Sequence, residues 1–333
     1  MKHVLVTGAS GYVARQLLQR HLLPSAAQGL CRLTLTDLSK PTVQLPGVHC
    51  VAGDLSDPLT WETLLAEPVD VVFHLAAIVS GRAEQDYAAG LDLNLHSTLA
   101  GLNACRLQHE RGGPRVRFMY ASSIAVYGTP LPRRIDDHTP MRPSLSYGAH
   151  KRMIELMIDD LSRRQSLDGR GLRLSGVVVR PRSANGALSG FNSDVIREPL
   201  SGHEIVCPVL PGACLWLTSA EVAVDQLWQI SCIPWDEWTH TLQAQGDSAA
   251  PVFNAPSWPL RVSALVKALG AIDPQAPARV RYDPAAPLQA QFGNWPEEAE
   301  FALASAFHLP CDSTRFGGDV VAFVRTALQA SLL

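Results

Sequence analysis

Short runs of consecutive apolar residues alternate with longer amphipathic stretches over the first half of the chain. The apolar runs predict strands at 3–7, 32–36, 48–51, 69–74, 117–121 and 172–179. The stretches between them predict helices that begin near Tyr12, Pro58, Glu84 and Ser146. Because the apolar runs are continuous rather than alternating, we expect strands that are buried on both faces, as in a parallel sheet. This pattern predicts an α/β fold with a doubly wound parallel sheet, which binds its ligands at the carboxyl ends of the strands.

The composition of the sequence changes near residue 180, where proline, glycine and tryptophan become frequent and the apolar runs become shorter. We therefore expect a main sheet domain over 1–179 and a smaller C-terminal lobe, mainly substrate-binding, over 180–270. The remaining segment, 271–333, is expected to be mixed and to return to pack on the core, with a short strand at 279–282.

Composition narrows the class of protein without identifying a ligand. Of the 333 residues, 47% are hydrophobic and 18% are charged, which is typical of a globular chain. The net charge of −3 gives no electrostatic reason to expect a nucleic acid or an anionic membrane as partner. No apolar run is long enough for a membrane span, and the first strand follows the initiating methionine directly, so we expect a cytoplasmic protein. The seven cysteines are scattered, and we expect reduced thiols and no metal site.

A glycine turn lies between the first predicted strand and the first predicted helix. Gly8 allows a sharp turn, Gly11 allows backbone N–H groups to approach a phosphate, and the small Ala14 allows the helix to pack on the strand. The positive end of the helix, which begins at Tyr12 and Val13, would then face the phosphates. This turn predicts a dinucleotide site, although on its own the pattern is equally typical of an ordinary strand–turn–helix.

A second motif indicates redox chemistry at a carbinol carbon. Tyr147 and Lys151 are four residues apart on one face of a predicted helix, and Ser123 ends an upstream strand. We expect Lys151 and a cationic nicotinamide ring to lower the pKa of the Tyr147 phenol, so that this group acts as general base. Lys151 would also hold the nicotinamide ribose, and Ser123 would orient the substrate oxygen. Ser122 could contact the cofactor or the substrate, or could only satisfy the backbone.

Further residues at the strand ends are candidates for cofactor contacts. Asp37 could accept hydrogen bonds from the adenosine ribose and would repel a 2′-phosphate, which favours NAD over NADP; a turn aspartate is the alternative. Asp54 could bind the adenine amino group and Leu55 could pack on the ring, although Asp54 could equally belong to a turn. His74 is expected to be a core histidine. Asn94 is expected to tie its helix to the loop beside the site. Small or apolar residues after the fourth strand could lie against the cofactor: Leu75, Ala76 and Ala77.

Together, the glycine turn, Asp37, the Ser-Ser-x-x-Val-Tyr-Gly segment at 122–128 and the Tyr-x-x-x-Lys motif resemble the extended short-chain dehydrogenases/reductases, the nucleotide-sugar epimerase and dehydratase family. This resemblance implies a Rossmann domain that binds NAD over 1–179, with Asn94 and Pro181 among its cofactor contacts. Val79-Ser-Gly81, Val179-Arg-Pro181 and the run 195–202 are similar to the D-erythronate dehydrogenase branch, which oxidises the C2 hydroxyl of a four-carbon sugar acid with NAD.

A small sugar acid needs a cation for its carboxylate and polar partners for its hydroxyls. Arginine can hold a carboxylate through two parallel hydrogen bonds, and Arg182 and Arg197 lie in suitable stretches, although either could be a solvated surface charge. The other candidate substrate residues are Ser80, Ser123, Tyr147, Asn185 and Ser189.

Three functions remain open at this point. The first is a dehydrogenase of a short sugar acid, the second is a nucleotide-sugar epimerase or dehydratase with tightly held NAD, and the third is an inactive NAD-binding regulator. The family resemblance also implies a homodimer through the helices at 84–110 and 146–165.

Overall fold

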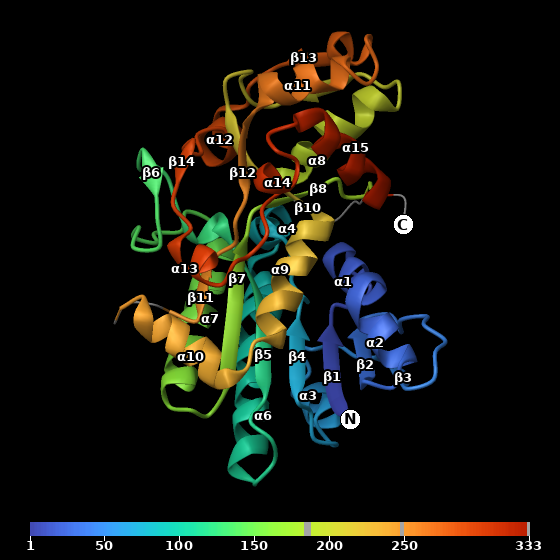
Figure 1. Ribbon diagram of the computed structural model, residues 1–333, viewed down its shortest axis with the longest axis vertical. Coiled ribbons are helices and arrows are strands. Elements are labelled where there is room, and N and C mark those ends of the chain that lie inside the picture. Colours follow the sequence, from blue (N-terminus) through green and yellow to red (C-terminus); the bar gives the residue numbers. More distant parts are fainter. Residues whose placement is uncertain (183–187, 247–249, 332–333) are drawn as a thin grey trace.

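The computed structural model describes residues 1–182, 188–246 and 250–331. Its largest element is a seven-stranded sheet in which every neighbouring pair of strands is parallel (Figure 1). This sheet confirms the predicted doubly wound α/β fold. In spatial order, its strands are β11 (Val252–Asn254), β7 (Asp168–Leu174), β5 (Arg117–Ser123), β4 (Val71–His74), β1 (Lys2–Thr7), β2 (Cys31–Asp37) and β3 (Val48–Ala52).

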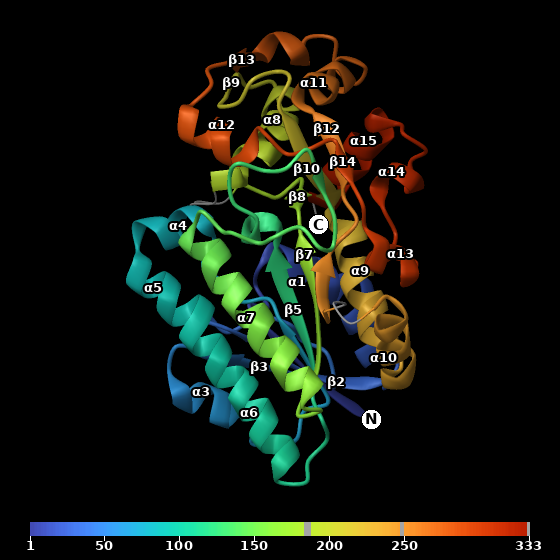
Figure 2. The same cartoon turned by 90° about the vertical axis from the view of Figure 1, so that its left-hand side faces the viewer.

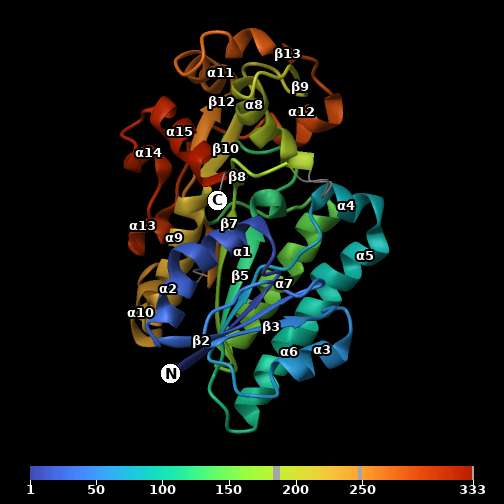
Figure 3. The same ribbon diagram turned by 90° about the vertical axis from the view of Figure 1, so that its right-hand side faces the viewer.

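Helices cover both faces of this sheet, which explains why its strands are apolar throughout (Figures 2 and 3). One face carries α3 (Pro58–Leu64), α6 (Thr98–Glu110) and α7 (Ser146–Arg163), whose apolar side chains pack on the sheet around Trp61, Leu102 and Ile154. The other face carries α1 (Tyr12–Leu17), η1 (Leu18–Leu22), α2 (Leu23–Ala27), α9 (Ala220–Cys232) and α10 (Trp235–Ala244).

Two predicted elements differ from the structure. The run 172–179 is not one strand, because the chain leaves the large sheet after Leu174 and enters a second sheet as β8 (Gly176–Val178). Both halves are buried and most of their residues are apolar, so hydrophobicity alone does not reveal the break at Ser175. The helix expected near Glu84 begins earlier, as α4 (Ser80–Gln85), and continues through α5 (Tyr87–Leu91) and η2 (Asp92–Ser97) into α6.

The smaller lobe is built around a three-stranded sheet of β8, β10 (Cys214–Ser219) and β12 (Trp258–Arg261). Its apolar core lies between this sheet and three helices, α8 (Phe191–Leu200), α11 (Val262–Gly270) and α15 (Val320–Ser331). The short strand expected at 279–282 is present as β13 (Val280–Tyr282) and pairs with β9 (Ile205–Cys207). The remaining elements are η3 (Ile124–Val126), β6 (Arg134–Ile135), η4 (Leu188–Gly190), η5 (Ala276–Arg279), α12 (Ala286–Phe292), β14 (Glu298–Ala299), α13 (Ala302–Ala306) and α14 (Asp312–Arg315).

The segment expected to form the lobe, 180–270, is divided between the two parts of the molecule. Its middle portion, comprising α9, α10 and β11, packs on the large sheet instead (Figure 1). The reason is visible in α9, whose apolar side chains, including Ala223 and Leu227, fill the same core as Leu17 of the first helix.

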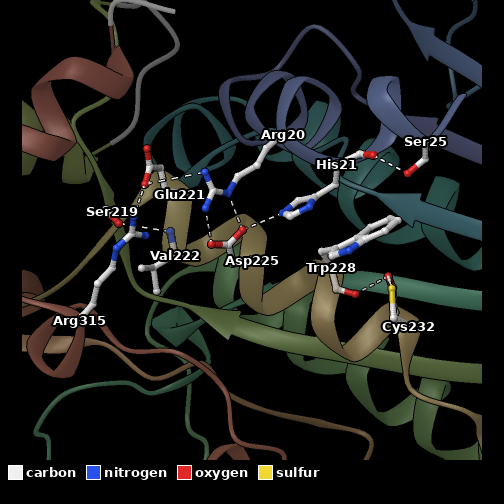
Figure 4. Close-up of polar contacts among 11 residues, drawn as sticks. Arg20, His21, Ser25, Ser219, Glu221, Val222, Asp225, Trp228, Cys232 and Arg315 are labelled. Carbon is white, nitrogen blue, oxygen red and sulfur yellow. Dashed lines mark hydrogen bonds and ion pairs between the residues drawn. The ribbon is translucent and has the colours of Figure 1, made fainter. Parts of the chain in front are cut away.

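Polar contacts also fasten α9 to the helix that follows the glycine turn (Figure 4). The Asp225 carboxylate accepts hydrogen bonds of 2.6 and 2.9 Å from Arg20 and lies 2.7 Å from Nε2 of His21. The His21 ring stacks on Trp228 with 5.1 Å between the ring centroids. Arg315 of α14 binds Glu221, one helical turn before Asp225, at 2.7 Å. The first helix is therefore held by residues that occur about two hundred positions later in the chain.

A search of the helices in the described residues finds none that is long and apolar enough to cross a membrane.

Candidate active site

The glycine turn lies where the strand order of the large sheet reverses. β1 pairs with β2 on one side and with β4 on the other, so the loops that follow β1 and β4 diverge and leave a crevice between them. Gly8 has a φ of 65°, and a Cβ atom there would lie 2.7 Å from the Cα and N atoms of Ala76. Only glycine therefore allows the two loops to come this close.

A groove of about 720 Å³ passes over this crevice. Helix α1 begins above it without a side-chain cap on its first turn, which leaves backbone N–H groups for phosphate oxygens. The Tyr12 hydroxyl is buried and has no hydrogen-bond partner among the described residues, as expected for a group that binds a ligand. These features fit a dinucleotide. Nine of the predicted cofactor contacts line this groove: Gly8, Gly11, Tyr12, Asp37, Leu55, Leu75, Ala76, Ala77 and Pro181.

The carboxylate of Asp37 is fixed at the rim of this groove. One of its oxygens accepts a hydrogen bond from the Ser10 backbone at 2.9 Å, and the other accepts one from the Leu38 backbone at 2.8 Å. Asp54 differs, because one of its oxygens accepts hydrogen bonds from the backbone and hydroxyl of Ser56. These hydrogen bonds lower the pKa of the Asp54 carboxyl. Asp54 therefore shapes a turn, whereas its neighbour Leu55 faces the groove.

Two other polar residues near the strand ends support the loops rather than line the groove. Asn94 accepts a hydrogen bond from the Ile78 nitrogen and donates one to the Ile78 oxygen, both at 2.8 Å, so it ties η2 to the loop after β4, as predicted. His74 is buried between the hydroxyls of Thr7 and Thr98, each 2.9 Å away. Burial, aided by the charge of Lys151, lowers the pKa of His74 to about 3.

The three predicted catalytic residues lie in one cavity of about 310 Å³ that adjoins the dinucleotide groove. Val13 lines this cavity as well. Ser123 lies at the end of β5, and Tyr147 and Lys151 lie on the first two turns of α7. Lys151 is only 3% exposed, and its Nζ atom donates a 2.8 Å hydrogen bond to the Ala121 oxygen. Burial lowers the pKa of Lys151 to about 7, while the negative charge of Glu155 opposes that shift.

Arg180 supplies the positive charge that acts on Tyr147. Burial raises the pKa of the Tyr147 phenol, and the opposing contributions come first from Arg180 and then from a hydrogen bond with Ser123. This differs from the prediction that Lys151 lowers the pKa of Tyr147. The physical reason is that the Lys151 ammonium is itself desolvated, lies 5.5 Å from the Tyr147 ring centroid and donates to a backbone carbonyl.

Ser122 is one of the residues that line the cavity, and its hydroxyl belongs to a buried hydrogen-bond network. It donates a 2.5 Å hydrogen bond to Glu155, whose carboxylate also accepts two from Arg173 at 3.0 and 3.1 Å. Arg152 binds the same carboxylate at 3.0 Å. Of the roles left open for Ser122, this geometry favours a structural one, in which its hydroxyl anchors the end of β5 to α7.

The predicted substrate residues fall into two places. Ser80 and Ser189 line the catalytic cavity together with Ser123 and Tyr147. Arg182 and Arg197 line the dinucleotide groove instead. Asn185 lies outside the described residues.

Both of the predicted carboxylate-binding arginines are already engaged by acids. Arg182, whose side chain is 63% exposed, forms two hydrogen bonds with Glu198. Arg197 binds Glu198 and Asp194 and donates to the Arg180 carbonyl. Their charges are thus largely compensated within the protein.

Arg180 is the main residue that sequence reasoning missed. It lines both the groove and the catalytic cavity, and within the described residues it forms no ion pair with a carboxylate. Its Nε atom donates to the Val177 oxygen at 3.1 Å, which holds the side chain against β8. The only signal in the sequence is its position in Val179-Arg-Pro181, directly after an apolar run.

The sequence model of the NAD dependent epimerase/dehydratase family matches residues 4–211. The chain belongs to this family. Two curated relatives are called D-erythronate dehydrogenase. The relative from Cupriavidus necator is 39% identical over 92% of this chain and 93% of its own length. The relative from Haemophilus influenzae is 38% identical over 74% of this chain and 78% of its own.

Solved structures give the same picture of the fold. A protein from Agrobacterium tumefaciens described as a nucleoside-diphosphate-sugar epimerase superposes with a TM-score of 0.87 at 32% identity, covering 99% of this chain and 94% of that one. The L-threonine dehydrogenase of Clostridium difficile superposes with a TM-score of 0.82 at 19% identity, covering 99% and 98%. That second likeness supports the fold alone. Family, relatives and site together identify the chain as a nicotinamide-dependent oxidoreductase.

Proposed function

We propose that this protein oxidises the C2 hydroxyl of a short sugar acid to a 2-keto acid, with NAD as hydride acceptor and an acid like D-erythronate as substrate. The curated relatives named D-erythronate dehydrogenase support this substrate class. The observation that carries the proposal is the position of Arg180, a cation beside Tyr147 that no carboxylate of the described residues neutralises.

This position matches the chemistry of a 2-hydroxy acid. In such a substrate the carboxylate is attached to the same carbon that carries the reacting hydroxyl. A cation that binds the carboxylate must therefore lie close to the general base, and Arg180 is near enough to Tyr147 to lower its pKa. Charge-assisted hydrogen bonds from a guanidinium to a carboxylate are short and strong. Arg182 and Arg197, the arginines predicted from sequence, are the rival candidates.

The residues of the cavity divide the reaction between them. Ser123 donates a hydrogen bond to the substrate hydroxyl and places it beside the Tyr147 oxygen. Tyr147, as phenolate, takes the hydroxyl proton while the C2 hydride leaves, and the C–O bond becomes a carbonyl. Arg180 favours the phenolate, and Lys151 holds the ribose. When bound, the nicotinamide supplies the electrophilic carbon that accepts the hydride.

The carboxylate of Asp37 supports NAD rather than NADP as the cofactor. Its two oxygens are held at the groove by the Ser10 and Leu38 backbone, where they can accept hydrogen bonds from ribose hydroxyls. A 2′-phosphate at the same place would meet a fixed negative charge. Asp54, Asn94 and Ser122 remain weaker proposals as cofactor contacts, because each already has a structural partner.

A panel of acids with NAD or NADP tests the function. D-erythronate, or a close four-carbon aldonate, is expected to reduce NAD stoichiometrically, as measured by the absorbance of the reduced cofactor. A second candidate, a nucleotide-sugar epimerase, is favoured by the solved structure described with that activity. It would be established if aldonates were inert and a nucleotide sugar were interconverted without net reduction of NAD. A protein that bound NAD and turned over neither class would be the inactive regulator.

We also propose a homodimer that forms through α5 and α7. Large apolar side chains are exposed on these neighbouring helices, namely Tyr87 on α5 and Met153, Leu156 and Met157 on α7. On α7, Leu156 and Met157 follow Met153 by three and four positions, so the three side chains form one stripe. We place the protein in the cytoplasm, because all seven cysteines are free thiols, as is usual in a reducing compartment.

A further inference from the structure

Besides the Tyr12 hydroxyl, two buried oxygens of residues that line the catalytic cavity have no hydrogen-bond partner in the described structure. They are Oγ of Ser175 and Oδ1 of Asn192. Ser175 lies in the break between β7 and β8, and Asn192 lies on the first turn of α8 and is 6% exposed. The Asn192 amide packs against the backbone of residue 176, where a Cβ atom would lie 2.7 Å from Nδ2. The two side chains therefore approach the cavity from neighbouring points of its wall.

Unpaired oxygens of this kind are uncommon in folded proteins. A buried acceptor without a partner destabilises the folded state, and most buried polar atoms are paired. The same first turn of α8 has a paired neighbour, since the Ser193 hydroxyl accepts a 3.0 Å hydrogen bond from the Arg180 backbone. Among the residues that the structure describes, the Ser193 hydroxyl thus has a hydrogen-bond partner and Oδ1 of Asn192 has none, which indicates a hydroxyl group of a ligand as the missing partner.

We propose that Ser175 and Asn192 bind a hydroxyl group of the substrate other than the one that is oxidised, and so select polyhydroxylated acids over simple 2-hydroxy acids. Oδ1 of Asn192 would accept a hydrogen bond from this hydroxyl, and the Ser175 hydroxyl can donate to it or accept from it. This inference rests on the proposed function and names the part of the substrate that the cavity distinguishes.

The position of Arg180 determines which way the substrate lies. Arg180 follows β8, and Ser175 precedes it, so the cation and the two unpaired oxygens surround one three-residue strand. With the carboxylate on Arg180 and C2 at Tyr147, the remaining carbons extend along this wall. The Trp216 and Trp295 rings also line the cavity. The Trp216 N–H already donates a 2.7 Å hydrogen bond to the Pro296 oxygen, so Trp216 presents only an apolar ring to a distal hydroxyl of the substrate.

Kinetics with two four-carbon acids test the proposal. D-erythronate carries two hydroxyls beyond C2, and (R)-2-hydroxybutyrate carries none. Asn192→Leu should lower kcat/KM for D-erythronate by about tenfold to a hundredfold, the usual effect of losing one buried hydrogen bond to substrate. For 2-hydroxybutyrate, kcat/KM should change by less than about threefold, because no hydrogen bond is lost there.

Ser175→Ala should act in the same direction as Asn192→Leu. Ser305→Ala, the same exchange at an exposed position of α13, is the matched control and should change neither substrate. Equal losses on both acids would mean that the two residues only shape the cavity, and no loss on D-erythronate would mean that they do not contact it. Either result overturns the inference. If wild-type protein oxidised neither acid, the proposed function itself would fail, and that failure is visible before any variant is made.

Thermal unfolding without ligand gives an independent measurement. Leucine fills a similar volume and removes an unpaired acceptor, so the Tm of Asn192→Leu should equal or exceed that of the wild type. A clear fall in Tm would show that the amide holds α8 in place, and a structural role would then replace the proposed one.

Discussion

Nδ1 of His74 lies 2.9 Å from the Thr7 hydroxyl, so the ends of β4 and β1 are joined by a side-chain hydrogen bond across the crevice where the strand order reverses. On the other side of the ring, Nε2 lies 2.9 Å from the Thr98 hydroxyl, which itself donates to the Asn94 oxygen at 3.1 Å. A neutral imidazole satisfies this chain of hydroxyls, because Nε2–H donates to Thr98 while Nδ1 accepts from Thr7. Protonation would turn Nδ1 into a second donor.

This arrangement predicts a loss of stability in mild acid. The unfolded chain binds a proton at His74 below pH 6.5, whereas the folded chain, with a pKa of about 3, does not. The free energy of unfolding should therefore fall as the pH drops below 6.5, by about 2 kcal/mol from this residue between pH 7 and pH 5. Urea unfolding over that range should show a smaller pH dependence for His74→Gln than for the wild type. His240→Gln, on the exposed side of α10, serves as control, and equal pH dependence in all three proteins would contradict the assignment.

Tyr147→Phe should remove turnover and preserve cofactor binding. The exchange deletes only the phenolic oxygen, and general acid–base groups usually contribute about 10²–10⁴-fold in rate. Steady-state kcat and NAD binding by fluorescence titration measure the two properties. Tyr282→Phe, in the smaller lobe, is the matched control. Activity near that of the wild type would show that another group takes the proton.

Replacing Asp37 should change the choice of cofactor. In the double variant Asp37→Ala with Leu38→Arg, the negative charge is lost and a cation enters at an exposed position that lines the groove. The ratio of kcat/KM for NAD to that for NADP should fall by at least about tenfold, the loss of one charge-assisted contact. Asp54→Ala should leave this ratio nearly unchanged, because that carboxylate lies in a turn. Wild-type protein that used both cofactors equally would contradict the role of Asp37.

The substrate carboxylate distinguishes Arg180 from the two arginines predicted from sequence. Arg180→Met should raise KM for the sugar acid at least about tenfold, because the lost interaction is a charge-assisted pair worth roughly 1.5–3 kcal/mol. Arg182→Met removes a guanidinium that Glu198 already neutralises, so KM should change little. If Arg182→Met or Arg197→Met produced the larger effect, the substrate carboxylate would lie in the dinucleotide groove instead of the catalytic cavity.

The proposed dimer can be tested with two leucines of equal exposure. Leu156 on α7 and Leu210 in the smaller lobe are each 51% exposed. Leu156→Glu should convert dimers to monomers, because a charge would be desolvated in an apolar interface. Leu210→Glu should have no effect on the oligomeric state. Sedimentation equilibrium measures the mass of each variant. A wild-type monomer, or a Leu156→Glu dimer as stable as the wild type, would exclude this interface.

Residues selected from local patterns lie along one groove and one adjoining cavity, and long-range pairing explains what those patterns missed. Gly8, Gly11, Tyr147 and Lys151 act through spacings of a few residues, which a sequence displays directly. Arg180 and Arg182 look alike in sequence, and the difference between them is Glu198, sixteen residues beyond Arg182, whose side chain neutralises one and not the other. The sequence does not reveal the break at Ser175, because the residues on both sides of it are buried and mostly apolar.

The hydrogen bonds between Asp225 and the first helix affect when the large sheet can be completed during synthesis of the chain. Arg20 leaves the ribosome early, but its partner follows 205 residues later, and the strand β11 later still. The part of the chain that matches the family ends at residue 211, before either of them. A nascent chain of that length lacks α9 and α10, two of the helices that cover one face of its sheet. The nucleotide-binding half of the molecule can therefore be completed only after β8, α8 and β10 of the smaller lobe have been synthesised.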